Sequence, residues 1–516
     1  MAAARRRLPA APVAIAVALA VLLPGWGAAQ TAADAQAPSA PAPPELLWDI
    51  RKSEPSLEPS PARPSAGEHS AKAETPNQWG PRNSGVHRLP PPDDFGATAQ
   101  VPGPTAPAAQ PLAPGHTELL ADDTEEPEAQ SPAAGLGPSA WKLPQPCLLQ
   151  RWGAELGGWV QQGITFNADR PADRFNGTVT TNDRDSEYQL NQAWLYLVRP
   201  AHTGGYGWDL GGRIDVIYGT DWRYGQSAGL EDRINSANRF YGLVLPQFYA
   251  EVAWNDLAVK LGHFATMTSY EVVPSPMNFF YSHSYLMAGY FDPLLVTGFQ
   301  AEYKWNEEWT LLAGMNNGWL TFEDPGHTYN FLGGAKWSSG DGRTRLSVMV
   351  DTGTQLGFTG PHVRTSVYTV LMHQLNEKLT YAGQVTAGRE SEGSFIRPGD
   401  DAQWYGMEHV LIRTFHPKWS AGVRYEWVRD EDGARIAGIG GLLGTDRGWR
   451  GLPGFTGSFH EFSVGLNWRP HPNAVLRPEI RWDWYDGPAN PFGQLPFDDK
   501  GDASQFTAAV DLLVTF

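Results

Sequence analysis

The chain has 516 residues, a formal net charge of −17 and a low mean hydropathy of −0.38, although 12% of its residues are aromatic. The acidic balance excludes nucleic acid as a partner, since a phosphate backbone needs clustered Lys and Arg. The single cysteine, Cys147, excludes an intramolecular disulfide and a cysteine-rich metal site. Sparse hydrophobicity carried by large rings is typical of a transmembrane β-barrel, in which every second strand residue meets lipid.

The first 29 residues have the pattern of an export signal. Arginines at positions 5–7 precede an apolar run over 11–23, and small residues at 27–29 provide a signal-peptidase site. The apolar run is shorter than the roughly 20 residues that a helix needs to cross a bilayer, and no other stretch comes closer. We expect cleavage after Ala29 and no transmembrane helix in the mature chain.

Residues 30–149 are rich in Pro and Ala, and more than half of the 43 prolines lie before position 147. Such a segment cannot bury enough apolar area to offset its ordering entropy. We therefore predict a disordered arm, partly in the polyproline II conformation, that precedes a barrel over 150–516.

After residue 150 the chain alternates between apolar and polar positions in segments as long as a membrane strand. In the clearest segment, 208–218, Trp208 and Leu210 lie on one face and Arg213 and Asp215 on the other. Three further segments show the same division: 297–305, 419–427 and 476–484. A soluble sandwich also alternates, but its apolar face is rich in Val, Ile and Leu rather than in the Trp, Tyr and Phe seen here.

The connections between these segments alternate in length. The short ones are turn-like: 255–256, 306–308, 338–342, 376–378, 416–418 and 470–473. The long ones are polar: 173–186, 221–238, 266–293, 390–402 and 430–457. The pattern predicts an all-β, antiparallel transmembrane barrel of about 16 strands, and the even number places both ends of the barrel, and so the arm, in the periplasm.

The last segment, SQFTAAVDLLVTF, has one continuous apolar face and ends on the aromatic Phe516. It resembles the C-terminal signal by which the barrel assembly machinery recognises its clients. With the export signal and the alternating segments, it predicts insertion into outer-membrane lipid of a bacterial cell.

Several longer motifs resemble one known family. They are GWVQQGITFN (158–167), YQLNQAWLYLVRP (188–200), LPQFYAEVAWNDLAVKLGHF (245–264) and YEVVPSPMNFFYSHSYLM (270–287). Together they resemble the putative β-barrel porin-2, or OmpL-like, family of bacterial outer-membrane proteins, over essentially everything after residue 150. The residues Thr266 to Ser269 depart from the family pattern, in which Pro-Ile-Gly or a similar sequence follows the Gly-x-Phe element. The resemblance implies a channel-like barrel and carries no particular substrate.

Charged side chains on the polar strand faces would be costly against lipid, roughly 2 to 4 kcal/mol for an Arg or Lys at the midplane. We expect them to line the lumen, where they set selectivity, form an internal mesh of ion pairs, or do both. The pore-lining candidates are Arg213, Asp215, Glu302, Lys304, Arg424, Glu426, Glu479, Arg481, Asp483 and Asp511.

The segment 266–293 follows the fifth predicted strand, the position from which general porins fold a loop inward. It is aromatic and sparsely charged, and an exposed loop this apolar needs something to pack against. We expect it to pack in the lumen and to narrow it. The constriction candidates are Glu271, Phe279, Tyr281, His283 and Tyr285.

These features favour passive diffusion of small hydrophilic solutes or ions, with cations or neutral solutes preferred, and no catalytic residue, metal or cofactor. A homo-oligomer is compatible with this strand number. Two alternatives remain open. One is an outer-membrane lipid hydrolase, in which Ser227 of the G-x-S-x-G match or Ser282 beside His283 acts with a histidine. The other is a structural envelope protein that the N-terminal arm tethers.

Overall fold

The computed structural model of the protein describes residues 140–516, apart from gaps at 232–233, 236–238, 288–290, 325–328, 358–359 and 437–453. The predicted export signal and the predicted arm up to residue 139 lie outside the described residues. Their roles stay predictions.

Sixteen strands and three short helices make up the described part of the chain. The strands are β1 (Glu155–Asn167), β2 (Tyr188–Arg199), β3 (Trp208–Gly219), β4 (Gly242–Trp254), β5 (Leu257–Ala265), β6 (Leu295–Lys304), β7 (Trp309–Asn316), β8 (Asn330–Ser338), β9 (Thr344–Gly357), β10 (Gly360–Asn376), β11 (Leu379–Glu390), β12 (Ala402–His416), β13 (Trp419–Asp430), β14 (Gly457–His471), β15 (Ala474–Asp486) and β16 (Ser504–Thr515). The helices are α2 (Cys147–Trp152), α3 (Trp222–Gly225) and the 3₁₀-helix η1 (Ser275–Met277).

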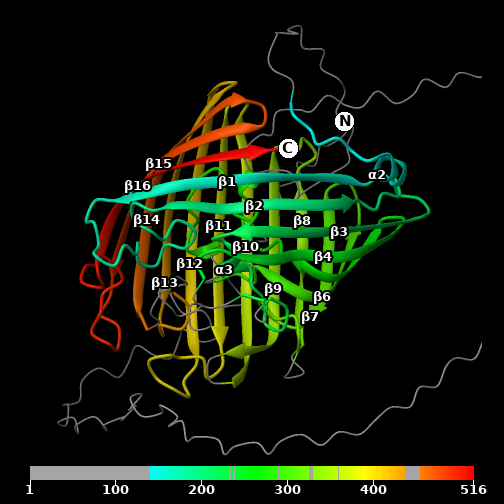
Figure 1. The fold of residues 1–516 in the computed structure, drawn as a ribbon. Coiled ribbons are helices and arrows are strands. Elements are labelled where there is room, and N and C mark those ends of the chain that lie inside the picture. The colour runs from blue at the N-terminus through cyan, green and yellow to red at the C-terminus, as the bar shows by residue number, and fades with distance from the viewer. Residues whose placement is uncertain are drawn as a thin grey trace, which may run out of the picture. The chain divides into compact units, whose positions relative to one another are not determined.

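The strands form one closed antiparallel sheet (Figure 1). Each strand pairs with its neighbours in sequence, and β1 pairs with β16, where Trp159 lies opposite Thr515. At the seam, Gly158 and Phe516 exchange backbone hydrogen bonds of 3.0 and 2.9 Å. A closed sheet leaves no unpaired edge, which is the condition for crossing lipid with strands. The predicted barrel of about 16 strands is confirmed.

The two faces of the strands differ in the way that the alternation predicts. In β3, Trp208, Leu210 and Ile214 are 72%, 51% and 50% exposed, whereas Arg213 and Asp215 are buried. Large apolar side chains at this exposure are unfavourable against water and favourable against hydrocarbon. The outward face of the barrel therefore suits lipid, and the charged groups lie inside.

Aromatic pairs lie on the outward face towards both ends of the strands. Trp419 and Trp468 stack at 5.7 Å near the short turns, and His460 stacks on Trp484 at 4.8 Å nearer the long connections. Rings with a polar edge are most stable at the boundary between hydrocarbon and water. These pairs correspond to the aromatic girdles of a membrane barrel.

Short turns gather at one end of the barrel and most of the long connections at the other. The turns after β4 and β8 contain residues in the left-handed region, Asn255 (φ 51°) and Gly342 (φ 67°), which let the chain reverse tightly. The predicted alternation is confirmed, except that β9 and β10 are joined by only 358–359. Both ends of the barrel lie on the side of the short turns.

The residues that precede β1 are docked on this same end. Trp141 stacks on His471 at 4.2 Å, and its backbone N–H donates to the Asn473 side chain at 2.6 Å. The Asn473 amide in turn donates to the carbonyls of Trp141 and Thr515 at 2.9 and 2.8 Å. Among the described helices, none is both long and apolar enough to span a bilayer.

Candidate constriction site

The described residues of the connection between β5 and β6, 266–287 and 291–294, lie inside the barrel. The aromatic side chains among them are buried, and the backbone contacts inward-facing side chains of β13 and β15. Asn278 stabilises a turn of the chain over residues 272–278. Its side chain accepts a hydrogen bond from the backbone N–H of Val272 and donates one to the carbonyl of Val272. This turn and helix η1 direct the aromatic stretch 279–285 against the wall. We call residues 266–294 the inner loop.

Glycines of the inner wall make room for rings of the inner loop. A Cβ at Gly422 would lie 2.4 Å from the ring of Phe279, and a Cβ at Gly163 would lie 2.7 Å from the ring of Tyr281. Both distances are shorter than carbon atoms tolerate. The wall and the inner loop are therefore complementary in shape at these positions.

Arg477 of β15 holds the first half of the inner loop. Its Nη1 donates to the carbonyls of Ser275 and Asn278 at 3.1 and 2.9 Å. The same guanidinium pairs with Asp511 of β16, with Nε 2.9 Å from Oδ1. The charge on Asp511 is thus neutralised by a neighbour that also binds the loop backbone.

Arg424 of β13 holds the middle of the inner loop. It pairs with Glu271 of the loop and with Glu461 of β14, and it donates to the carbonyl and the hydroxyl of Ser282 at 2.9 and 2.8 Å. Burial raises the pKa of Glu271, but Arg424 and the His283 side chain, whose Nδ1 lies 3.4 Å from Oε2, outweigh it and lower the pKa to about 2. Glu271 is therefore ionised at neutral pH.

Tyr281 connects β2 and β15, two strands of the same part of the wall that only β1 and β16 separate. Its backbone N–H and that of Ser282 donate to Glu479 of β15 at 3.0 and 3.3 Å. Its hydroxyl donates to Asn191 of β2 at 2.9 Å. The loop starts at β5, which lies half-way around the barrel from β13, so it crosses the lumen to reach this wall.

Glu426 and Asp483 hold the end of the aromatic stretch. Glu426 accepts hydrogen bonds from the backbone N–H groups of Tyr285 and Leu286, both at 2.7 Å. The Tyr285 hydroxyl donates to Asp483 at 2.7 Å, and Asp483 pairs with Arg481 at the same distance. Charged hydrogen bonds in a buried setting are among the strongest in proteins.

Arg213 and Asp215 of β3 are buried away from these contacts. They pair at 2.8 Å, and Asp215 also accepts hydrogen bonds from Trp194 and Gln247 at 3.0 and 3.1 Å. They form a separate ion pair on the wall around β2, β3 and β4. Their role in selectivity stays a prediction.

Glu302 and Lys304 lie at the short-turn end of β6 and are partly exposed. Glu302 pairs with Lys336 at 3.3 Å, and Lys304 pairs with Glu307 of the turn at 3.1 Å. The Lys336 Nζ that pairs with Glu302 also lies 3.6 Å from Sδ of Met267, so Glu302 is linked to the start of the inner loop. Contacts with the middle of the loop are made by Arg424, Glu426, Glu479, Arg481 and Asp483.

A further buried ion pair joins the connections 168–187 and 220–241. Arg223 of α3 donates to both oxygens of Asp183, at 2.8 Å each. Sequence reasoning treated these connections as external polar loops and missed the pair. The signal available was an uninterrupted polar stretch, 180–186, which needs partners once it is buried.

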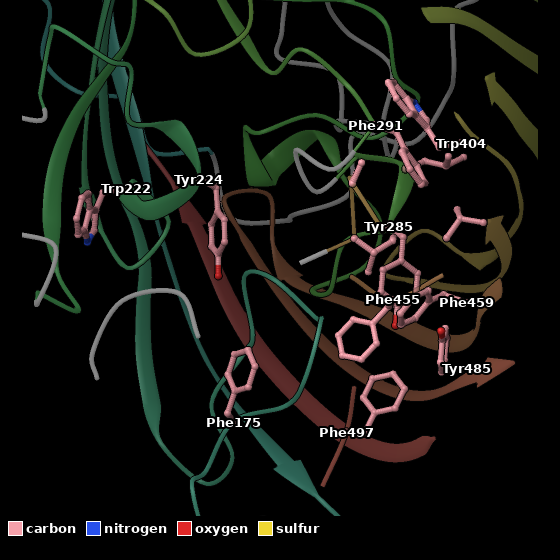
Figure 2. Close-up of a cluster of buried hydrophobic side chains, with 14 of the residues drawn as sticks. Phe175, Trp222, Tyr224, Tyr285, Phe291, Trp404, Phe455, Phe459, Tyr485 and Phe497 are labelled. Carbon is pink, nitrogen blue, oxygen red and sulfur yellow. The ribbon is translucent and has the colours of Figure 1, made fainter. Parts of the chain in front are cut away.

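Aromatic side chains from these connections meet in one apolar cluster (Figure 2). Phe175 comes from the first connection, Trp222 and Tyr224 from α3, and Tyr285 and Phe291 from the inner loop. The wall contributes, among others, Trp404, Phe459 and Tyr485. Packing against several strands fixes all three connections within the barrel.

The sequence profile described as putative beta-barrel porin-2, OmpL-like, matches residues 153–516. The chain belongs to this family. The resemblance inferred from the four sequence motifs is therefore confirmed. A comparison with curated proteins returned no match.

Solved outer-membrane barrels resemble this porin-2 family member at low sequence identity. The channel DcaP of Acinetobacter baumannii is 11% identical, with coverage of 70% of this chain and 98% of that chain and a TM-score of 0.47. The anion-selective porin of Comamonas acidovorans is 11% identical, with coverage of 70% and 99% and a TM-score of 0.47. OprB of Pseudomonas putida is 12% identical, with coverage of 72% and 96% and a TM-score of 0.44.

The two serines of the hydrolase hypothesis are both buried in this porin-2 family member. The Ser227 hydroxyl lies 3.4 Å from Nε2 of His263, and Nδ1 of that ring lies 2.9 Å from the Thr297 hydroxyl. The Ser282 hydroxyl accepts hydrogen bonds from Arg424 and Arg481. In the described part of the chain the Ser282 hydroxyl has no hydrogen bond to a histidine or carboxylate of the kind that activates a serine nucleophile.

Proposed function

We propose that the chain is a non-enzymatic channel of the bacterial outer membrane, through which small hydrophilic solutes diffuse passively. The family supports a porin, and the closed barrel with an apolar outward face supports a position in lipid. The observation that carries the proposal is the inner loop, which is anchored to charged groups of the lumen wall by Arg424 and Glu426.

In this proposal the inner loop narrows the lumen. Its carboxylate and hydroxyl groups, with the arginines of β13 and β15, form the polar surface that a solute meets. A preformed arrangement of charges acts as a filter, because it stabilises solutes of complementary charge and excludes those that are too large. The pore-lining candidates near the inner loop, such as Glu479 and Arg481, would therefore set selectivity.

We further propose how the barrel is oriented in the membrane, how it is assembled and how its copies associate. The short-turn end faces the periplasm, and Trp141 marks the place where the N-terminal arm reaches the barrel. The assembly machinery recognises the C-terminal segment that ends at Phe516. Copies of the chain associate through their outward faces within the membrane.

Uptake of neutral sugars into liposomes that contain the purified protein tests the channel. Swelling rates should fall steeply as the sugar becomes larger, because the inner loop limits the passage. Folded protein that gives no swelling above that of empty liposomes with any sugar would reject the proposal. Phospholipid hydrolysis that is abolished by Ser227→Ala would instead support the enzyme.

A further inference from the structure

Four carboxylates form a continuous row on the inner wall. The strand register places Glu408 of β12 opposite Glu426 of β13, Glu426 opposite Glu461 of β14, and Glu461 opposite Asp483 of β15. All four side chains are buried. Like charges directly opposite each other on adjacent strands repel, so this row needs compensation.

The negative charges of three carboxylates in the row are stabilised by neighbouring donors or cations. Glu426 accepts two backbone N–H groups of the inner loop, Glu461 pairs with Arg424, and Asp483 pairs with Arg481. Glu408 differs. Its side chain is only 1% exposed, and neither of its carboxylate oxygens has a hydrogen-bond partner within the described ranges of the chain.

A second carboxylate without a hydrogen bond lies in the same part of the lumen. Asp292, near the end of the inner loop, is 2% exposed, and both of its oxygens lack a donor within hydrogen-bonding distance in the described part of the structure. It lies beside the Gln384 amide and close enough to Glu426 and Arg435 to interact with their charges. Gln384 is also the register partner of Glu408, so both carboxylates border the same group.

The net charge around Glu408 and Asp292 is negative. Glu408 interacts with Glu271, Glu426 and Glu461, and Asp292 interacts with Glu426. The cations near them are Arg424, which already pairs with Glu271 and Glu461, and Arg435 near Asp292. A buried carboxylate without a partner costs several kcal/mol unless it takes up a proton or gains a cation. The excess of carboxylates over arginines favours a cation at this site.

We propose that Glu408 and Asp292 form a binding site for a small inorganic cation between the inner loop and the β11–β13 wall. This inference rests on the proposed channel function, because the cation reaches the site through the lumen. No group of three metal-binding side chains converges within the part of the chain that the structure describes. The cation therefore keeps part of its hydration shell and binds weakly, as an ion in transit must.

The test is the ion selectivity of the full chain in planar bilayers, with K⁺ as the conducted ion and Ca²⁺ as the competing probe. Under a KCl gradient at neutral pH, Glu408→Gln should lower the K⁺/Cl⁻ permeability ratio by about twofold or more, because the amide keeps the shape and removes the charge. The same variant should raise the Ca²⁺ concentration needed for half-maximal block of the K⁺ current. Asp292→Asn should shift both quantities in the same direction.

Glu377→Gln is the matched control, because it removes the same charge from an exposed residue of the short turn between β10 and β11. It should leave selectivity and block at the wild-type values. If Glu408→Gln and Asp292→Asn both conduct with unchanged selectivity and unchanged Ca²⁺ block, the carboxyls hold protons instead of a cation and the inference is wrong. Wild-type protein that conducts no ions would overturn the channel function itself, which is a distinguishable result.

Discussion

Arg424 on β13 forms a buried ion pair with Glu271 of the inner loop, and this contact joins the barrel wall to the segment that crosses the lumen. The same guanidinium binds the backbone of the inner loop at Ser282. Arg424 therefore both neutralises the charge of Glu271 and fixes the middle of the inner loop, alongside Arg477 and Glu426.

Glu271→Gln should loosen the inner loop and change its charge. Arg424 keeps Glu461 as a partner, so we expect a loss of about 1–3 kcal/mol, which is typical of a charged hydrogen bond, rather than unfolding. Reversal potentials under a KCl gradient should move towards anion preference. Unchanged reversal potential and unchanged thermal unfolding would show that Glu271 neither borders the passage nor holds the inner loop.

Gly422→Val should displace the inner loop from its packed position on β13, because any Cβ at residue 422 would overlap the ring of Phe279. Overpacking of this kind costs about 1–3 kcal/mol. Single-channel conductance should rise as the loop moves from the wall. Gly340→Ala is the control, since a Cβ there meets its nearest atom, of Glu308, at an ordinary 3.5 Å. Equal conductance for the two variants would contradict a role of the Gly422–Phe279 contact in positioning the inner loop.

Arg223→Met should destabilise the packing of the connections 168–187 and 220–241. It leaves the buried Asp183 with Arg184 as its ion-pair partner and Gln189 as a hydrogen-bond donor, and removal of one partner of a buried pair costs about 3–5 kcal/mol. Thermal unfolding of the barrel in detergent measures the effect. The double change Asp183→Asn with Arg223→Met should recover part of the loss. A double variant as unstable as the sum of two independent losses would count against direct coupling.

The stability of the protein should depend on pH with opposite signs at Glu271 and Asp292. The pKa of Glu271 is lowered to about 2 from 4.5, so its stabilising contribution is present above pH 4.5 and disappears as the pH falls through about 2. Burial raises the pKa of Asp292 well above 3.8. As the pH rises from 3.8, the unfolded chain loses this proton first, so Asp292 reduces stability.

Asp292→Asn therefore should stabilise the protein at pH 8 and have little effect at pH 3. Unfolding midpoints of the variant and the wild type, measured at both values without divalent cations, test the sign. Glu271→Gln should show its largest loss at pH 8 and approach the wild type near pH 2. A larger benefit of Asp292→Asn at pH 3 than at pH 8 would contradict the assignment.

The strands could be predicted from the sequence because alternation with a period of two is a local property. Once Trp208 and Leu210 are placed on the lipid-facing side, the period of two places Arg213 and Asp215 on the inward side. Closure of the sheet then gives every strand one inward and one outward face. The same reasoning predicted an inward position for Arg424, Glu426 and Arg481. Their sequence neighbours alone determine which face they share.

The partners of these side chains could not be predicted, since they depend on contacts between residues far apart in the chain. Glu408, Glu461 and Arg477 lie on the same inward faces as the predicted candidates, yet only the register brings Glu408 opposite Glu426 and leaves it without a donor in the described structure. The pair of Asp183 and Arg223 joins two connections for which no period exists. Irregular segments are positioned by packing, which a single sequence does not reveal.

The channel claim is tested most directly by the single-channel conductance of the purified full chain in planar bilayers. The account predicts discrete current steps in KCl, and larger steps when residues 267–291 of the inner loop are replaced by a short Gly-Ser linker. Folded wild-type barrel without current steps, together with equally silent loop-shortened protein, would contradict it.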